Sequence, residues 1–253
     1  SKLDIKNRKI KIESRGKNVG LATALNIGCE IAIENKSRFI IAFDQDSNPG
    51  RSMILTLKND ILEFQGKNER VVAIGPQLID ERENEKIVSP FIQFTRFGFT
   101  KWSGNGVEPV SQLITSGCMI DLRIWSEDNK FKDDLFIDFV DNNWCWRMTR
   151  KGFVLVGTAN TEMPHEISEK IEKRINLSTN TYKPARRYFQ IRNSVYHLFF
   201  EPLSLAQKIY VLKAIAVTLV SVLISDEHRM RSIWQCVRGT AHGVTRKLGP
   251  YSK

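Results

Sequence analysis

The chain has 253 residues, of which 42% are hydrophobic and 26% are charged. This composition is typical of a soluble protein with a sizeable core and excludes collagen-like and disordered chains; the four cysteines form no CxxC pair, which excludes a zinc knuckle and a thioredoxin motif. The net charge of the chain is +10: residues 170–253, with 15 Lys and Arg and 4 Asp and Glu residues, carry +11, and the rest carries −1. A polyanionic partner is therefore expected, with a solvated basic face as the alternative.

The first part of the chain alternates strands and helices. After a short predicted strand at Ile10–Glu13, the small-residue-rich segment Leu21–Glu34 predicts a helix, and Arg38–Phe43 predicts a buried strand that ends at Asp44. A helix over Arg51–Phe64 and a second buried strand at Val71–Gly75 follow. This alternation favours an α/β fold with a parallel or mostly parallel sheet.

The later part of the chain changes character near residue 180. Strands are expected near Ile87–Thr95 and at Phe153–Val156, a short helix near Leu122–Glu127, and a helix over Asp138–Lys151. Three consecutive helices are then predicted, over Arg186–Phe200, Leu203–Ile224 and Met230–Val244. We therefore expect an α/β domain over residues 1–180 and a basic helical region over residues 181–253.

An acidic pair follows the first buried strand. Asp44 and Asp46, separated by Gln45, can present two hard oxygen ligands to Mg²⁺ or Mn²⁺ at the carboxyl end of a strand, where ligands bind in open α/β sheets. Since Mg²⁺ usually completes its shell with water and phosphate oxygens, the pair suggests a metal–diphosphate site. A polar turn closing a strand is the alternative. The absence of GxxxxGK[ST] disfavours a P-loop ATPase.

Several blocks together resemble family 2 glycosyltransferases, and most closely the bacterial rhamnosyltransferases that use dTDP-L-rhamnose. These blocks are NVGLATALNIG from Asn18 to Gly28, FIIAFDQDSNPG from Phe39 to Gly50, LFIDFVDNNWCWRMTRKGF from Leu135 to Phe153, MPH at 163–165 and RRYFQIRN at 186–193. The resemblance implies a GT-A type, Rossmann-like mixed sheet. It also implies inverting transfer of L-rhamnose to a lipid-linked saccharide, in O-antigen or other surface polysaccharide synthesis, on the cytoplasmic face of the bacterial membrane.

Members of that family begin with a further strand–helix–strand segment that holds the nucleotide base and ribose. The chain begins without Met, just before the strand that would be third in the family, so we expect an N-terminally incomplete sheet. The alternative function is therefore a truncated, inactive glycosyltransferase-like binding module.

The resemblance also implies residue roles. Asp141 would be the catalytic base, its pKa raised by Asp138, three residues earlier on the same helical face. An acidic start to a helix is the alternative interpretation of Asp141. The metal would be held by Asp44, Asp46 and His165; the donor by Asn18, Gly20, Asn26, Asp44, Arg186 and Arg192; and the remaining substrate groups by Ser116, Gly117, Asp138 and Trp144. For Trp144 core packing, for Ser116 and Gly117 a simple turn, and for the arginines a solvated basic helix remain open.

The basic tail carries an apolar helical stripe. Leu205, Ile209, Leu212, Ile215, Ala216, Leu219, Val220 and Leu223 recur at steps of three or four, and Lys208 and Lys213 lie off the stripe. The apolar run is interrupted by Lys213 and short for a membrane-spanning helix. We expect peripheral attachment to an anionic membrane; packing onto the α/β domain is the competing use of the stripe. Long apolar runs disfavour nucleic acid as the partner.

Overall fold

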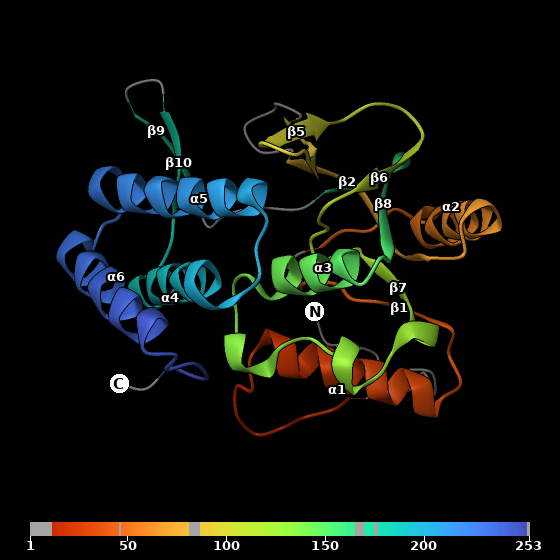
Figure 1. The fold of residues 1–253 in the computed structure, drawn as a ribbon, viewed down its shortest axis with the longest axis horizontal. Helices are drawn as coiled ribbons and strands as arrows, with labels where there is room; N and C mark the ends of the chain where they lie inside the picture. The colour runs from red at the N-terminus through yellow and green to blue at the C-terminus, as the bar shows by residue number, and fades with distance from the viewer. Residues whose placement is uncertain (1–11, 46, 81–86, 165–169, 175–176, 252–253) are drawn as a thin grey trace.

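The computed structural model describes residues 12–45, 47–80, 87–164, 170–174 and 177–251. It consists of an α/β part followed by helices that lie beside the sheet (Figure 1). This is the predicted fold class, a Rossmann-like arrangement followed by a helical region. Ile12 and Glu13 form no regular structure, and the rest of the strand expected at residues 10–13 lies outside the described residues.

The central sheet is mixed. Its strands lie in the order β1 (Phe39–Ile41), β7 (Met119–Asp121), β2 (Val71–Asp80), β8 (Val154–Pro164) and β6 (Val107–Val110), with β3 (Ile87–Ser89) paired to β2. β2 and β8 are parallel, whereas β1–β7, β2–β7, β6–β8 and β2–β3 are antiparallel. The expectation of a parallel or mostly parallel sheet is therefore wrong. The connection through α2 does make β1 and β2 run in the same direction, but β7 lies between them and is antiparallel to both.

Helices cover both faces of this sheet. Helix α2 (Met53–Lys67) places Met53, Leu57 and Ile61 against one face, and all three are fully buried at a spacing of four residues. Helices α1 (Leu21–Glu34) and α3 (Val140–Arg150) contribute to the core on the other face. Two further antiparallel hairpins, β4 (Phe91–Phe94) with β5 (Phe99–Trp102) and β9 (Lys170–Arg174) with β10 (Leu177–Thr181), lie outside the main sheet.

The C-terminal helices pack around α4 (Pro184–Phe200). Helix α6 (Arg229–Val244) approaches α4 closely because two glycines face it: a Cβ on Gly239 would lie 2.7 Å from the Tyr188 carbonyl oxygen. Helix α5 (Leu205–Ile224) begins with a capping box formed by Ser204 and Gln207. A buried ion pair between Arg187 and Asp226, with N···O 2.7 Å, fixes α4 to the α5–α6 turn.

Candidate active site

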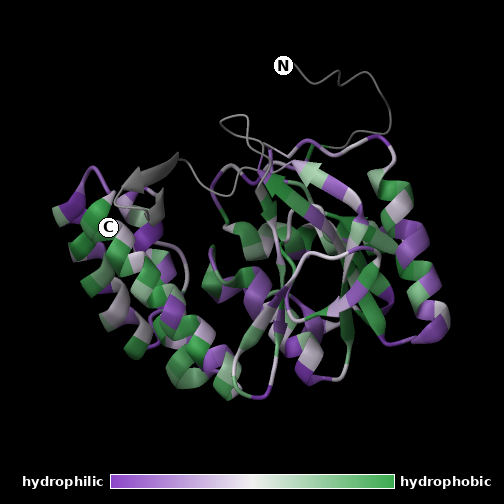
Figure 2. Cartoon of the chain, turned by 90° about the horizontal axis from the view of Figure 1, so that it is seen from above, coloured by the Kyte–Doolittle hydropathy of each residue, from purple (hydrophilic) through white to green (hydrophobic). Residues whose placement is uncertain are grey.

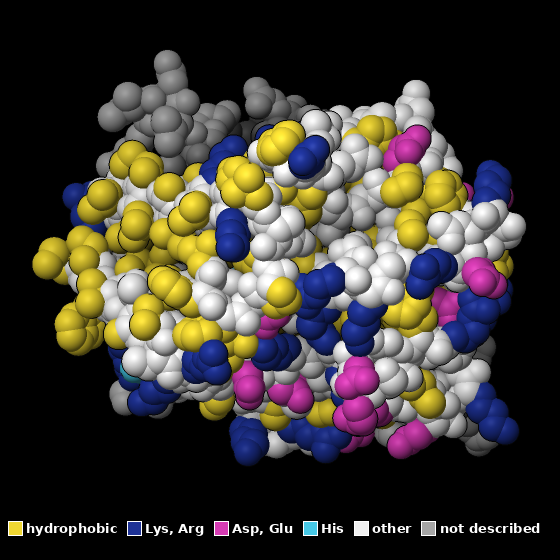
Figure 3. Space-filling model, in the orientation of Figure 1, with side chains coloured by type: hydrophobic (Ala, Val, Ile, Leu, Met, Phe, Trp, Pro, Cys, Tyr) yellow, Lys and Arg dark blue, Asp and Glu magenta, His cyan; other side chains and the backbone are white. Residues whose placement is uncertain are grey.

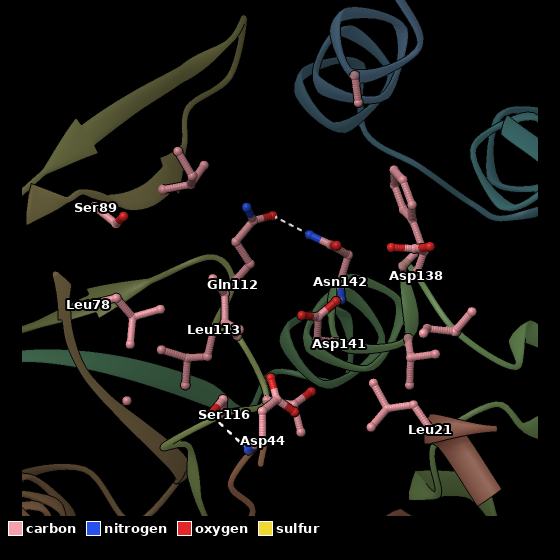
Figure 4. Close-up of a pocket in the computed structure, with 18 of the residues that line it drawn as sticks. Leu21, Asp44, Leu78, Ser89, Gln112, Leu113, Ser116, Asp138, Asp141 and Asn142 are labelled. Carbon is pink, nitrogen blue, oxygen red and sulfur yellow. Dashed lines mark hydrogen bonds between the residues drawn. The ribbon is translucent and has the colours of Figure 1, made fainter. Parts of the chain in front are cut away.

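A cavity of about 900 Å³ opens beside the carboxyl end of β1, between the α/β part and the C-terminal helices. Polar side chains reach it from the segment after β1, the loop before β7 and the start of α3 (Figure 4). Helices α4 and α5 contribute further polar side chains to its lining. The polar residues that line it include Asp44, Gln112, Ser116, Asp138, Asp141, Asn142, Arg186 and Tyr210. Five of these, Asp44, Ser116, Asp138, Asp141 and Arg186, are residues that the sequence predicts for the site.

The segment after β1 is tied to the loop before β7. The Asp44 backbone N–H donates to Ser116 Oγ at 3.2 Å, and the hydroxyls of Ser47 and Ser116 lie 2.5 Å apart. The Gly117 N–H donates to the carbonyl of Ala42 at 2.8 Å. Ser116 and Asp44 therefore lie next to each other in the cavity lining. Gly117 does not line the cavity, and its backbone hydrogen bond holds the loop against the end of β1.

Asp141 lies in the first turn of α3 and faces the cavity. Its Oδ1 accepts a hydrogen bond from the Asn142 backbone N–H at 2.8 Å. The surrounding chain removes water from the carboxylate, and this desolvation raises the pKa of Asp141 to about 6, with the negative charges of Asp138 and Asp44 adding to the effect. A pKa near neutrality suits a general base.

Asp138 precedes α3 and is not on its helical face, which corrects the expected placement. Its φ is +61°, and Phe136 and Phe139 also have positive φ, of 65° and 62°. Left-handed backbone at residues with large side chains is strained and persists only where neighbouring structure enforces it. The charge of Asp138 still raises the pKa of Asp141, as predicted, but Asp138 does so from the loop before α3 and not from the helix itself.

Helix α4 supplies the restraint on this loop. The Asn193 side-chain amide donates to the carbonyls of Ile137 and Asp138, both at 2.8 Å, and Arg192 donates to the carbonyls of Leu135, at 2.8 Å, and Gly249. Arg192 is fully buried in these contacts. It therefore positions the 135–138 loop, instead of facing the cavity as a phosphate-binding residue would. Asn193 is the last residue of the block RRYFQIRN, but no role was predicted for it.

The Asp138 carboxylate is only partly satisfied. Its Oδ1 lies 3.3 Å from Arg186 Nε, and its Oδ2 has no hydrogen-bond partner among the described residues. Burial raises the pKa of Asp138, and the nearby Arg186 and Arg187 oppose that rise. An unmatched buried acceptor costs about 1–3 kcal/mol, so a ligand hydroxyl that donates to Oδ2 would recover that energy.

A hydrogen-bonded chain of neutral side chains crosses the cavity wall. The Asn142 amide donates to Gln112 Oε1 at 2.9 Å, and Gln112 Nε2 donates to the Tyr210 hydroxyl at 2.9 Å. The Tyr210 ring also packs edge-on against Phe94 and Trp146. These two hydrogen bonds link the start of α3 to α5. Sequence reasoning missed all three polar members, since isolated Asn, Gln and Tyr residues form no motif.

Four other predicted site residues, Trp144, Asn26, Gly20 and Asn18, lie away from the cavity. Trp144 is in the core, stacked on Phe131 and donating to the Asn129 carbonyl at 2.8 Å, which is the packing alternative of the sequence analysis. The Asn26 side chain both donates to and accepts from the backbone of Phe131. Gly20 has a φ of +86°, and a Cβ there would lie 2.6 Å from the Phe136 ring, so only glycine allows this close approach.

Asn18 and Gly20 instead line a second hollow of about 380 Å³ on the N-terminal side of α1. The Gly20 N–H donates to Asn18 Oδ1 at 2.9 Å, which closes a local turn ahead of the helix. This hollow shares no lining residue with the larger cavity. Neither residue therefore meets the carboxylates of Asp44, Asp138 and Asp141.

The predicted metal site is only partly described. Asp46 and His165 lie outside the described residues, and within the described part no group of three His, Cys, Asp or Glu residues is arranged to hold a metal ion. Asp44 presents a carboxylate to the cavity. Mg²⁺ commonly takes one or two protein carboxylates and fills its remaining positions with water and phosphate oxygens, so the Asp44 carboxylate is of the ligand type that this ion uses.

Comparison with curated proteins gives one informative similarity. The chain is 26% identical over 242 residues to the dTDP-rhamnosyl transferase RfbF of Shigella flexneri, a match that covers 93% of this chain and 79% of that protein. No family model matches the sequence. The similarity supports a glycosyltransferase. At this identity it supports a nucleotide-sugar donor and a saccharide acceptor in general terms.

The raised pKa of Asp141 predicts a stability effect. An unfolded Asp titrates near 3.9, so between that pH and about 6 the folded state retains a proton that the unfolded state has lost, and stability falls as the pH rises. Above about pH 6 the folded state has to bury the ionised Asp141 carboxylate, which costs about 3 kcal/mol of stability at about 1.4 kcal/mol per pKa unit. Asp141→Asn removes this cost because the amide carries no charge. Thermal denaturation of the metal-free protein should show Asp141→Asn melting several degrees above wild type at pH 8 and level with it at pH 4. The exposed Asp128→Asn is the control, and an Asp141→Asn melting point at or below wild type at pH 8 would contradict the burial argument.

Proposed function

We propose that the protein is an inverting glycosyltransferase that moves L-rhamnose from dTDP-L-rhamnose to a lipid-linked saccharide. The observation that supports this most is the meeting of Asp141 with Asp44 in one large cavity, where Asp141 has a pKa suited to a base. The donor is carried over from the similarity to the dTDP-rhamnosyl transferase.

In this mechanism the acceptor hydroxyl lies against Asp141 and gives up its proton to that carboxylate as its oxygen attacks the anomeric carbon. The bond between this carbon and the diphosphate breaks in the same displacement, so the configuration inverts and dTDP leaves. General base catalysis of this kind typically contributes about 10²–10⁴-fold. Asp44 and Asp46, with His165, would hold Mg²⁺ or Mn²⁺, and the ion would supply positive charge to offset the negative charge of the leaving diphosphate.

The other cavity residues hold and orient the reactants. Asp138 Oδ2 accepts from a sugar hydroxyl. Arg186, which contacts Asp138 and lies over the Tyr182 ring, brings a positive charge to the cavity wall that favours a phosphate or a polar acceptor group there. Ser116 holds the segment that carries Asp44 in place. The hydrogen bonds from α4 to the 135–138 loop restrain Asp138 beside the start of α3 before substrate arrives.

The acceptor and the pathway follow from the proposed reaction. A saccharide on a lipid carrier, assembled into O-antigen, lipopolysaccharide or another surface polysaccharide, is available at the inner face of the bacterial cell membrane. The enzyme would therefore act from the cytoplasm as a peripheral protein.

Donor selection tests this proposal. Because a ligand that binds only the folded state stabilises it by about 2.7 kcal/mol at 100 times its Kd, dTDP-L-rhamnose with Mg²⁺ should raise the melting temperature by several degrees. UDP-glucose at the same concentration should do so less, and Arg186→Gln should weaken the effect. Equal stabilisation by both nucleotide sugars would refute the proposed donor, and no stabilisation by either would refute donor binding by this chain.

A further inference from the structure

Helix α5 presents an apolar stripe to solvent. Seven residues define this outer stripe of α5: Leu205, Ile209, Leu212, Ala216, Leu219, Val220 and Leu223. All are exposed, and Leu205, Leu212 and Leu223 each expose more than half of their surface. Of the residues in the predicted stripe, Ile215 turns inward and packs against the core. The stripe as a whole does not pack onto the α/β part, which excludes that competing use.

Helix α6 carries a matching stripe. The outer stripe of α6 consists of Met230, Trp234, Val237, Ala241 and Val244, which recur at steps of three or four and are exposed. Met230 and Trp234 are 78% and 64% exposed. Figure 3 shows hydrophobic side chains gathered over this end of the molecule, and Figure 2 shows the same helices rich in strongly hydrophobic residues. Large side chains exposed together in this way mark an interaction surface.

Basic side chains border both stripes. On a helix that turns by about 100° per residue, Lys208 and Lys213 fall on the two opposite edges of the α5 stripe. Arg229 and Arg231 are exposed at the start of α6 on either side of its stripe. An apolar face with cationic edges is the pattern of a helix that lies in the headgroup region of a bilayer. A symmetric contact with a second copy would instead bring together two surfaces with positively charged edges.

The same helix forms a wall of the cavity. Tyr210, Ala214 and Thr218 line the cavity, and by helical geometry they point about 180° away from the middle of the outer stripe. Among the described residues, α5 is a helix of 20 residues with a mean hydropathy of 1.7, which is long and apolar enough to cross a membrane, so the expectation that its apolar run is too short is wrong. Only 17% of its most apolar stretch is buried. Its inner face, however, carries polar cavity residues and packs against α4 and α6.

We infer that the outer stripes of α5 and α6 form a docking surface for an anionic lipid bilayer, on which the protein lies without spanning it. One helix then separates the bilayer from the cavity, so the cavity lies within reach of a saccharide that projects from its lipid carrier. The binding to lipid stands without the proposed reaction; only this link to the acceptor rests on the proposed function.

Vesicle co-sedimentation of the full chain tests the inference. The protein should pellet with vesicles rich in phosphatidylglycerol at low salt, and less with phosphatidylcholine vesicles or at high salt. Lys208→Gln with Lys213→Gln should lower the partition coefficient about fivefold per lysine. Leu212→Asn with Leu219→Asn should lower it on the order of a hundredfold.

The matched control replaces two exposed aliphatic residues on α2, away from both stripes. Ile54 and Leu55 on α2 are 52% and 62% exposed, so Ile54→Asn with Leu55→Asn makes the same chemical change away from the stripes and should leave partitioning unchanged. Circular dichroism melts confirm folding of each variant. Equal pelleting with anionic and neutral vesicles, or equal loss in the α2 control, would overturn the inference. So would light scattering that shows a dimer in solution which the Leu212 and Leu219 changes dissociate, because a second copy would then cover the surface.

Discussion

Asp141→Asn lowers the rate of sugar transfer by about 10²–10⁴-fold, because an amide oxygen accepts the Asn142 hydrogen bond but cannot take up the acceptor's proton. The substitution keeps the shape of the side chain, so dTDP-L-rhamnose should still raise the melting temperature of the variant. Steady-state release of dTDP gives the rate, and the exposed Asp128→Asn is the control for loss of a carboxylate. A wild-type rate in Asp141→Asn would place the base elsewhere, with Asp138 the next candidate.

Loss of the acidic pair is expected to have a comparable effect. Asp46→Ala should lower kcat/KM by orders of magnitude without unfolding the protein, and wild-type transfer should stop in excess EDTA and resume with added Mg²⁺ or Mn²⁺. Asp44→Asn should do the same. It should also lower the pKa of Asp141, because the charge on Asp44 helps to raise it. Full turnover in excess EDTA would contradict the metal-assisted mechanism.

Local patterns were sufficient to predict the long elements. Leu21–Glu34 was predicted with the bounds that α1 has, and the buried strands at β1 and β2 were evident as apolar runs. Strands β5, β6 and β7 were missed because each has three or four residues and no long apolar run, so their pairing partners decide their conformation. The direction of β7 between β1 and β2 is likewise a tertiary outcome.

The same distinction applies to the site. Motif order predicted Asp44, Ser116, Asp138, Asp141 and Arg186, and the structure places all five around one cavity. Motif order could not show that the Arg192 side chain is engaged in hydrogen bonds to the 135–138 loop. A buried arginine and a phosphate-binding arginine look alike in sequence. A period of 3.6 residues likewise reveals an apolar stripe on α5 but not the side to which that stripe turns.

In the proposed reaction, a sugar is transferred in this cavity with Asp141 as the base. The most direct measurement incubates the purified chain with dTDP-L-rhamnose, Mg²⁺ and a lipid-linked saccharide fraction, and follows dTDP release by chromatography and the lipid product by mass spectrometry. The wild-type protein should form dTDP and a lipid product with one added deoxyhexose in equal amounts, with the anomeric configuration inverted, and Asp141→Asn should form neither at a comparable rate. Donor binding by the wild-type protein without any transferred sugar would contradict the claim and identify the chain as a binding module.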